Sequence, residues 1–218
     1  MRQILLVNNE PTPSERGVIV RAEELGLAAP LYNIDALSAR LSAFGTVTVR
    51  HYTQLEQDVP APDGIVLSGC FTGWDRERLR ETFAAELALV RETDVPLLGV
   101  CAGAQLIGLA FGAPLLYPGG EYEEFGFLPQ TVVERHPLLD GLGGTFRCFE
   151  HHRGQLGCLP DGFRLLATRG NCPVQMFAHR TRPLFGTQFH PELQNGPHHD
   201  GQRILENFFQ SYIPEERV

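Results

Sequence analysis

The sequence contains no lysine, so all 18 of its basic residues are arginine. This absence excludes mechanisms that depend on a lysine side chain, namely the Walker-type phosphate loop, the pyridoxal Schiff base and the lysine general base. Positive charge is scarce overall, because 26 acidic residues give the chain a net charge of −8. Such a chain has no excess of cations to neutralise phosphates. We therefore expect no nucleic-acid partner and no binding to a membrane surface.

Long apolar runs are also missing. No stretch approaches the roughly 18 apolar residues of a membrane-spanning helix, and the initial MRQILLVNNE does not have the pattern of a secretory signal. The five cysteines are odd in number and form no Cys-x-x-Cys pair, which argues against a disulfide framework and against a structural zinc site. We expect a reduced, cytoplasmic protein that holds no metal.

The first half of the chain alternates between strand-like and helix-like segments. Strand-like runs cover residues 2–9, 46–52, 63–69 and 95–100, and apolar residues recur at helical spacing in 33–45 and 79–90. This order indicates βαβ units and a mostly parallel sheet covered on both faces. Residues 10–32 are expected to form a long loop or insertion.

The second half changes character. Several short strand-like runs, joined by proline and glycine turns, precede a final amphipathic helix; the runs are TVVER, TFRCF, FRLLATR, PVQMFAH and PLFGTQF. No repeat, low-complexity tract or composition shift marks a boundary between domains. The sequence therefore predicts one α/β domain over residues 1–218, with added β-structure.

The segment PLLGVCAGAQLIGLAFG, residues 96–112, places a cysteine between two glycines, after a strand-like run and before a helix-like one. This order is typical of a nucleophile elbow, in which the reactive side chain stands on a sharp strand-to-helix turn. Gly99 and Gly103 suit such a turn, because a side chain at either position would collide with the adjacent strand or helix. The start of the following helix favours a thiolate at Cys101. Taken alone, the segment also fits a cysteine that merely packs between helix and sheet.

The segment LFGTQFHPEL, residues 184–193, supplies the acid and base that a cysteine nucleophile needs. His190 follows an apolar strand, and functional residues of parallel α/β sheets gather at the C-terminal ends of strands. Glu192 is two residues further on, so in an extended segment it lies on the same face as His190. Its carboxylate can then orient the imidazole and stabilise the imidazolium.

GVCAGAQLIG together with GTQFHPE resembles the class I, or triad, glutamine amidotransferase domain. The resemblance covers nearly the whole chain and includes DGIVLSG, EEFGF, the segment 151–179 and the C-terminal helix. The part from LPDGF to HPE is most similar to the glutaminase part of GMP synthetases. The resemblance implies a three-layer α/β/α, flavodoxin-like fold with a cysteine nucleophile elbow. It also implies an enzyme that needs no cofactor and releases ammonia from glutamine through a γ-glutamyl thioester, for transfer to a separate synthetase subunit.

The resemblance assigns roles to residues at both ends of the motifs. Cys101 is expected to be the nucleophile, His190 the general acid and base, and Glu192 the residue that orients His190. The backbone N–H groups of Ala102 and Cys70 are expected to form the oxyanion hole.

The same resemblance places four residues around the substrate. Gln105 matches the family glutamine that contacts the substrate, and Gly69 belongs to the loop of the oxyanion hole. His151 and His152 fall where the family's backbone holds the amino-acid end of the substrate.

The chain departs from the family pattern at two places. Cys70 and Phe71 replace the second glycine and the proline of a Gly-Gly-Pro loop, which changes the shape of the pocket. Residues 151–154 read His-His-Arg-Gly where the family often has Ser-His-Gly-Asp, so an acidic residue is lost and Arg153 is added. This second change favours a substrate whose amine is different or blocked.

Two other functions therefore stand beside the glutaminase. One is a stand-alone γ-glutamyl amide or peptide hydrolase that uses the same triad with water as the acceptor. The other is a non-catalytic, partner-binding subunit, which retention of Cys101, His190 and Glu192 argues against. Cysteine-elbow proteins of the stress-protein and deglycase type rank lower, because they lack the matching His-Pro-Glu segment.

Overall fold

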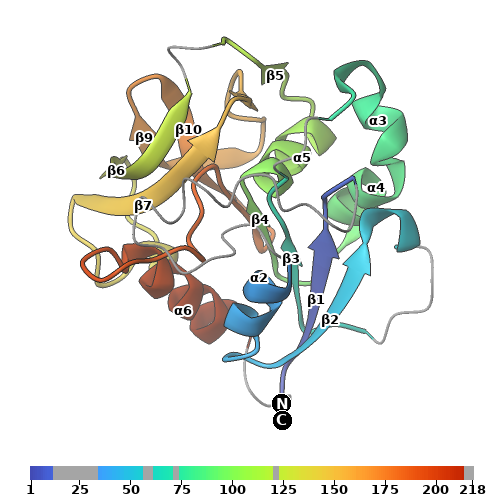
Figure 1. The fold of residues 1–218 in the computed structure, drawn as a ribbon, viewed down its shortest axis with the longest axis horizontal. Helices are drawn as coiled ribbons and strands as arrows, with labels where there is room; N and C mark the ends of the chain where they lie inside the picture. The colour runs from blue at the N-terminus through green and yellow to red at the C-terminus, as the bar shows by residue number, and fades with distance from the viewer. Residues whose placement is uncertain (12–33, 56–60, 71–73, 120–122, 214–218) are drawn as a thin grey trace.

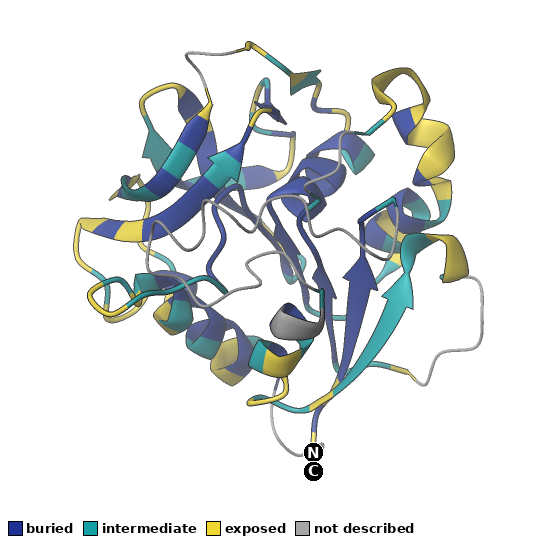
Figure 2. Ribbon diagram, viewed as in Figure 1, coloured by how far each residue is buried: buried dark blue, intermediate teal, exposed yellow. Residues whose placement is uncertain are grey.

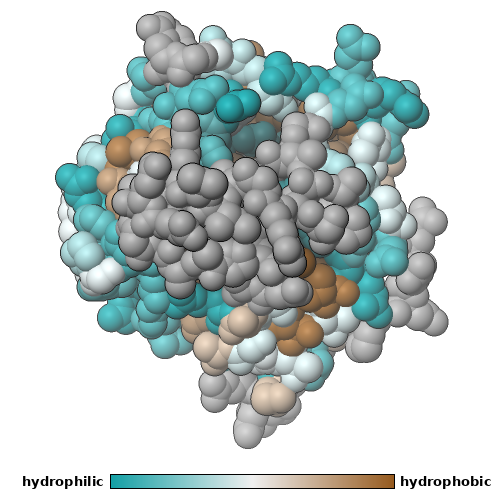
Figure 3. Space-filling model, in the orientation of Figure 1, coloured by the Kyte–Doolittle hydropathy of each residue, from teal (hydrophilic) through white to brown (hydrophobic). Residues whose placement is uncertain are grey.

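The structure is a computed structural model that describes residues 1–11, 34–55, 61–70, 74–119 and 123–213 (Figure 1). The expected long loop over residues 10–32 lies almost entirely outside these ranges. Among the described residues, no helix has the length and apolar character needed to span a membrane. On the face seen in Figure 3, the described surface is mainly hydrophilic and its hydrophobic patches are small.

One nine-stranded sheet has the strand order β2-β1-β3-β4-β11-β10-β9-β6-β7. Its parallel part comprises β1 (Gln3–Asn8), β2 (Thr46–His51), β3 (Gly64–Leu67), β4 (Leu97–Val100) and β11 (Leu184–Thr187). The antiparallel part comprises β6 (Glu124–Val132), β7 (Thr145–His152), β9 (Phe163–Arg169) and β10 (Cys172–His179). The expected mixed sheet, with a parallel centre and added antiparallel strands, is confirmed. Because this sheet joins the first strand to the last, we propose that the chain forms a single domain.

Helices cover both faces of the sheet, which gives the expected three layers (Figure 1). Helices α2 (Ile34–Leu41) and α6 (Asp200–Tyr212) pack on one face, and α4 (Ala84–Glu92) and α5 (Ala102–Ala110) pack on the other. Strand β1 is apolar throughout because it serves both cores. Ile4 and Leu6 join the cluster beneath α2 and α6, whereas Leu5 and Val7 join the opposite cluster. Figure 2 shows these central strands buried and the outer faces of the helices exposed.

The register of the parallel strands brings three chain segments to one edge of the sheet. Leu67 of β3 pairs with Gly99 of β4, and Thr187 of β11 pairs with Val100 of β4. The chain therefore leaves all three strands at adjacent positions. The residues that follow are Gly69–Cys70, Cys101 and His190, which are the candidates that the sequence identified.

The helix expected over residues 79–90 is in fact two helices. Helix α3 (Leu79–Thr82) ends and α4 begins on either side of Phe83, whose backbone dihedrals are φ −105° and ψ 22°. The Phe83 ring lies 4.6 Å from the ring of Tyr52 and 4.6 Å from that of Trp74, measured between centroids. The apolar spacing predicted the buried face correctly. It could not predict the break, because the partners of Phe83 come from other segments.

The second half differs from expectation mainly in where its strands begin. The run TVVER is only the end of β6, which starts at Glu124 and pairs with β7 from Glu124↔His152 to Thr131↔Thr145. Gly126 and Pro129 obscure its alternation in the sequence. A small second sheet, β5 (Leu115–Leu116) with β8 (Gln155–Leu156), was not predicted. Short 3-10 turns complete the fold at Tyr52–Gln54 (η1), Arg76–Arg78 (η2) and Pro137–Leu139 (η4).

Candidate active site

Cys101 stands on a strained turn between β4 and α5. Its φ is 49° and its ψ −104°, and among the described non-glycine residues no other φ is positive. Such a backbone costs about 1–3 kcal/mol and persists only where the surroundings fix it. Here the Cys101 N–H donates to Thr187 O at 2.7 Å, and Cys101 O accepts from Gln105 N at 3.0 Å. The fold therefore holds Cys101 in the geometry of a nucleophile elbow.

The two flanking glycines make this turn possible. A Cβ at Gly99 would lie 2.6 Å from Gly103 C and 2.7 Å from Ala104 N. A Cβ at Gly103 would lie 2.5 Å from the carbonyl oxygen of Leu67 in β3. Both contacts are with backbone, which cannot move aside as a flexible side chain can. The reason that the sequence analysis gave for these glycines is therefore visible in the packing.

His190 and Glu192 form a close pair beside Cys101. His190 Nδ1 lies 2.8 Å from Glu192 Oε1, and the imidazole is fully buried. The backbone N–H of His190 donates to Phe149 O at 2.8 Å, which fixes the segment against β7. Burial would lower the pKa of His190. The charges of Glu192 and Cys101, and hydrogen bonds to both side chains, outweigh burial and raise this pKa to about 10. At neutral pH the imidazole therefore carries a proton that it can donate.

Two glutamines connect the nucleophile to the loop after β7. Gln105 Nε2 donates to Gly154 O at 2.8 Å and to Gln188 Oε1 at 3.2 Å. Gln188 Nε2 in turn donates to Cys101 Sγ at 3.6 Å. Gln105 was expected to contact substrate, and the structure shows it buried and holding the backbone at Gly154. Sequence reasoning missed Gln188, although it stands two residues before His190 in the segment that carried the resemblance.

The two histidines of the substrate loop point to different places. The carbonyl oxygen of His151 lies 4.0 Å from Cys101 Sγ, so the backbone at this position does face the nucleophile. The imidazole of His152 is buried, with its Nε2 3.0 Å from Glu124 Oε2 and 3.4 Å from Glu150 Oε2. Only the backbone of His152 is therefore available to a substrate.

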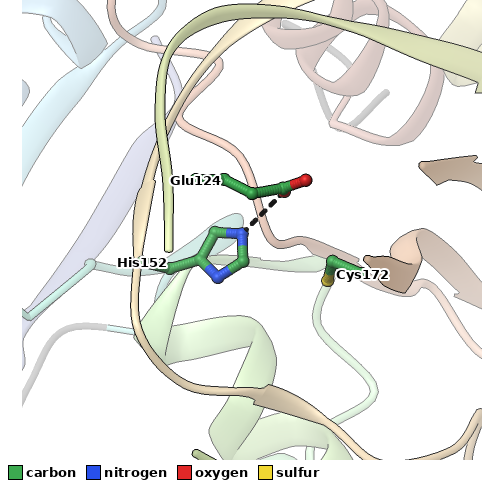
Figure 4. Close-up of side chains that lie close together, drawn as sticks. All are labelled: Glu124, His152 and Cys172. Carbon is green, nitrogen blue, oxygen red and sulfur yellow. Dashed lines mark hydrogen bonds and ion pairs between the residues drawn. The ribbon is translucent and has the colours of Figure 1, made fainter. Parts of the chain in front are cut away.

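A buried group of ionisable side chains holds this loop from below. Glu124, His152 and Cys172 have ligand-type atoms within 4.8 Å of one another (Figure 4). These residue types could hold a metal ion. The carboxylate of Glu124, however, already accepts from Arg169 Nε at 2.7 Å and from Gln175 Nε2 at 2.8 Å. The contacts favour a network of hydrogen bonds and ion pairs over a metal centre.

Glu150 completes this network. Burial raises the pKa of Glu150 well above its usual range, and the nearby carboxylate of Glu124 adds to the shift. Glu150 Oε1 accepts from Gln130 Nε2 at 2.6 Å. A protonated Glu150 avoids placing a second negative charge beside Glu124 in the core. The network thereby ties β6, β7 and β9 together beneath the His151–His152 backbone.

Comparison with known proteins identifies the family. The model of the class I glutamine amidotransferase family matches residues 31–212. The glutamine-hydrolysing subunit of GMP synthase from Thermoplasma acidophilum is 36% identical over 146 residues, which are 67% of this chain and 70% of the relative. The corresponding protein of Methanosarcina mazei is 36% identical over 149 residues, 68% and 73% of the two chains.

Solved structures give the same result. A crystal structure described as that of a putative GMP synthase subunit from Thermoplasma acidophilum superimposes with a TM-score of 0.72 at 27% identity, covering 96% of this chain and 93% of that one. A glutamine amidotransferase of Thermotoga maritima shares the fold, with a TM-score of 0.64 at 20% identity over 97% and 82% of the two chains. The chain belongs to the class I glutamine amidotransferase family. The expected family, enzyme class and fold are thereby confirmed.

Proposed function

We propose that this chain is the glutaminase subunit of a two-subunit GMP synthase, which releases ammonia from glutamine for a separate synthetase subunit. The similarity to several glutamine-hydrolysing subunits of GMP synthases supports the synthetic role. The observation that carries the chemistry is the His190–Glu192 pair at 2.8 Å beside the strained Cys101.

The first half of the proposed reaction forms a thioester. The sulfur of Cys101 attacks the side-chain amide carbon of glutamine, and the carbonyl oxygen becomes an oxyanion. The N–H groups of Ala102 and Cys70 stabilise that oxyanion. His190 donates a proton to the amide nitrogen, the C–N bond breaks, and ammonia leaves a γ-glutamyl thioester on Cys101.

The second half returns the enzyme to its resting state. A water molecule attacks the thioester carbon while His190 accepts one of its protons. The C–S bond breaks, the sulfur of Cys101 is released, and glutamate departs. Glu192 stabilises the imidazolium of His190 at each protonated stage. The sum is glutamine plus water giving glutamate plus ammonia.

We expect an electrophilic glutamine analogue to modify Cys101 selectively, and glutamine to protect it. Intact-mass measurement and peptide mapping would identify the modified residue, with iodoacetamide as a reagent that reports reactivity without glutamine recognition. If iodoacetamide labels Cys101 but the analogue does not, the nucleophile is reactive and the pocket is built for another substrate. That result would contradict the glutaminase proposal.

One feature favours the γ-glutamyl amide hydrolase as the second candidate. Gly154 replaces the acidic residue of the family, and a Cβ there would lie 2.6 Å from the ring of Tyr117. Burial raises the pKa of Tyr117; Arg76 opposes this shift, and Cys70 and Cys101 add to it, so this ring lies within electrostatic range of both sulfurs. The Arg76 guanidinium stacks on the same ring, 3.7 Å from its centroid. This side of the site thus offers a cation where the family offers a carboxylate.

We expect free glutamine to be a better substrate than a γ-glutamyl amine or an N-acylated glutamine. The comparison of kcat/KM across these three compounds measures how much the α-ammonium group contributes to recognition. Arg76→Ala removes the cation and should strengthen the preference for free glutamine over the N-acylated compound. Arg164→Ala is its control, because Arg164 pairs with Glu134 on the antiparallel part of the sheet. A clear preference of the wild-type protein for the γ-glutamyl amine would replace the first proposal by the second.

A further inference from the structure

A chain of buried hydrogen bonds runs from the core to the loop after β3. Asn9, at the end of β1, contacts Ser68 twice: its backbone N–H donates to Ser68 Oγ at 3.0 Å, and its side-chain Nδ2 donates to Ser68 O at 3.0 Å. Both residues are buried. Nothing in the catalytic scheme above uses either of them. Their side chains are therefore polar groups whose burial needs another explanation.

The hydroxyl of Ser68 ends this chain on a particular peptide group. Ser68 Oγ donates to Gly69 O at 2.9 Å, while it accepts from the backbone N–H of Asn9. The carbonyl of Gly69 and the N–H of Cys70 belong to the same planar trans peptide, in which they point in opposite directions. Fixing the carbonyl oxygen therefore also fixes the direction of the Cys70 N–H.

The position of this peptide relates it to the nucleophile. Leu67 pairs with Gly99 in the parallel register of β3 and β4. Two residues further along each chain stand Gly69 and Cys101. The peptide that Ser68 holds thus follows β3 at the same edge of the sheet as the nucleophile follows β4.

Asn9 is itself held from the far side by Glu86 of α4. Asn9 Nδ2 lies 3.2 Å from Glu86 Oε1, and the Glu86 side chain is completely buried. Burial raises the pKa of Glu86 to about 8, against a smaller opposing effect of its hydrogen bond to Asn9. The carboxyl is therefore mostly neutral at pH 7, and its contact with Asn9 brings no full charge into the core. Trp74 Nε1 donates to Asn9 O at 3.3 Å and closes the other side.

We propose that Ser68 is a positioning residue for the oxyanion hole: held by Asn9, its hydroxyl fixes the Gly69–Cys70 peptide so that the Cys70 N–H faces the developing oxyanion. This inference rests on the proposed glutaminase function and on the oxyanion role of Cys70. It explains how the loop keeps its donor in place although Cys70 replaces a family glycine. Preorganisation of such donors is a main source of catalysis in acyl transfer.

The test is a comparison of Ser68→Ala with the wild-type protein in two reactions. Loss of a whole oxyanion donor costs roughly 10²–10³ in kcat, so loss of its alignment should lower kcat by about 10- to 100-fold, with KM for glutamine unchanged. Alkylation of Cys101 by iodoacetamide is a direct displacement that forms no oxyanion. Its rate should stay within about twofold of the wild-type rate, because Ser68 touches neither Cys101 nor His190.

Two further variants separate positioning from a general loss of structure. Ser68→Thr keeps the hydroxyl and is expected to recover most of kcat. Ser42→Ala is the matched control, because Ser42 Oγ also donates to a backbone carbonyl, that of Ser38 at 2.9 Å, but lies in an exposed turn after α2. Its kcat should equal that of the wild type.

The outcomes that would overturn the proposal differ from those that would overturn the function. A Ser68→Ala kcat within about twofold of wild type would remove Ser68 from the mechanism, and so would a fall in kcat matched by an equal fall in the alkylation rate. A threonine variant as slow as alanine, at an unchanged melting temperature, would do the same. Failure of the wild-type protein itself to hydrolyse glutamine would instead overturn the glutaminase proposal.

Discussion

Replacing Cys101 with alanine should lower the rate of glutamine hydrolysis by a factor on the order of 10⁵ or more, to the uncatalysed background. The reason is that both halves of the proposed reaction pass through a bond to the Cys101 sulfur. His190 and Glu192 cannot compensate, because members of a catalytic unit lose their value together when one is removed. The measurement is ammonia or glutamate release under saturating glutamine, on a variant whose melting curve matches that of the wild type.

Cys70→Ala provides the matched control. Cys70 is expected to contribute its backbone N–H, which alanine retains, so a measurable fraction of the activity should remain. The Cys70 thiol contacts Glu10 Oε2 at 3.9 Å, and its loss removes only this weak interaction. Equal loss of activity in the two variants would show that the loop after β3 acts through its side chain, contrary to the proposed oxyanion role.

Replacing Gly103 with alanine should destabilise the protein by about 3 kcal/mol or more and reduce kcat by roughly 10²-fold. The new Cβ would stand 2.5 Å from Leu67 O and 2.7 Å from Leu67 Cβ. Since Leu67 belongs to a central strand of the sheet, the start of α5 must move instead. Any such movement displaces Cys101, which immediately precedes the helix. Urea unfolding measures the first effect, and steady-state kinetics the second.

Gly144→Ala is the control for this substitution. A Cβ at Gly144 meets no atom within 4 Å among the described residues, and Gly144 is not among the glycines with a positive φ. Its stability and activity should therefore be close to those of the wild type. If Gly103→Ala behaved in the same way as Gly144→Ala, the close approach of α5 to β3 would not be needed to hold the elbow.

Several features of the site could be predicted from local sequence. The order strand, Gly-x-Cys-x-Gly, helix announces the elbow, because only glycines fit where backbones approach this closely. The two-residue spacing from His190 to Glu192 places both side chains on one face, and the structure shows them 2.8 Å apart. The continuous apolar run of β1 predicts a strand buried on both faces. In each case the property depends on neighbours within a few residues.

Other features could not be predicted, because their partners are distant in the chain. The role of Gln188 becomes apparent only when β11 lies beside β4 and Gln188 reaches the Cys101 thiol. The imidazole of His152 turns into the core because Glu124 and Glu150, on strands that pair with or contain it, supply acceptors there. The same holds for Ser68, which meets Asn9 only through the pairing of β1 with β3.

The sequence by itself determined the family, the class of fold and the candidate triad of Cys101, His190 and Glu192, since each rests on residue types at short, fixed spacings. Tertiary structure alone decided which side chains support that triad. Parallel strands bring their ends together from positions tens of residues apart, and a buried polar group must find its partner among whatever the fold places beside it. For that reason the nucleophile could be named from its own motif, whereas the hydrogen bonds that lead from Glu86 through Asn9 and Ser68 to the Gly69–Cys70 peptide appear only in the folded chain.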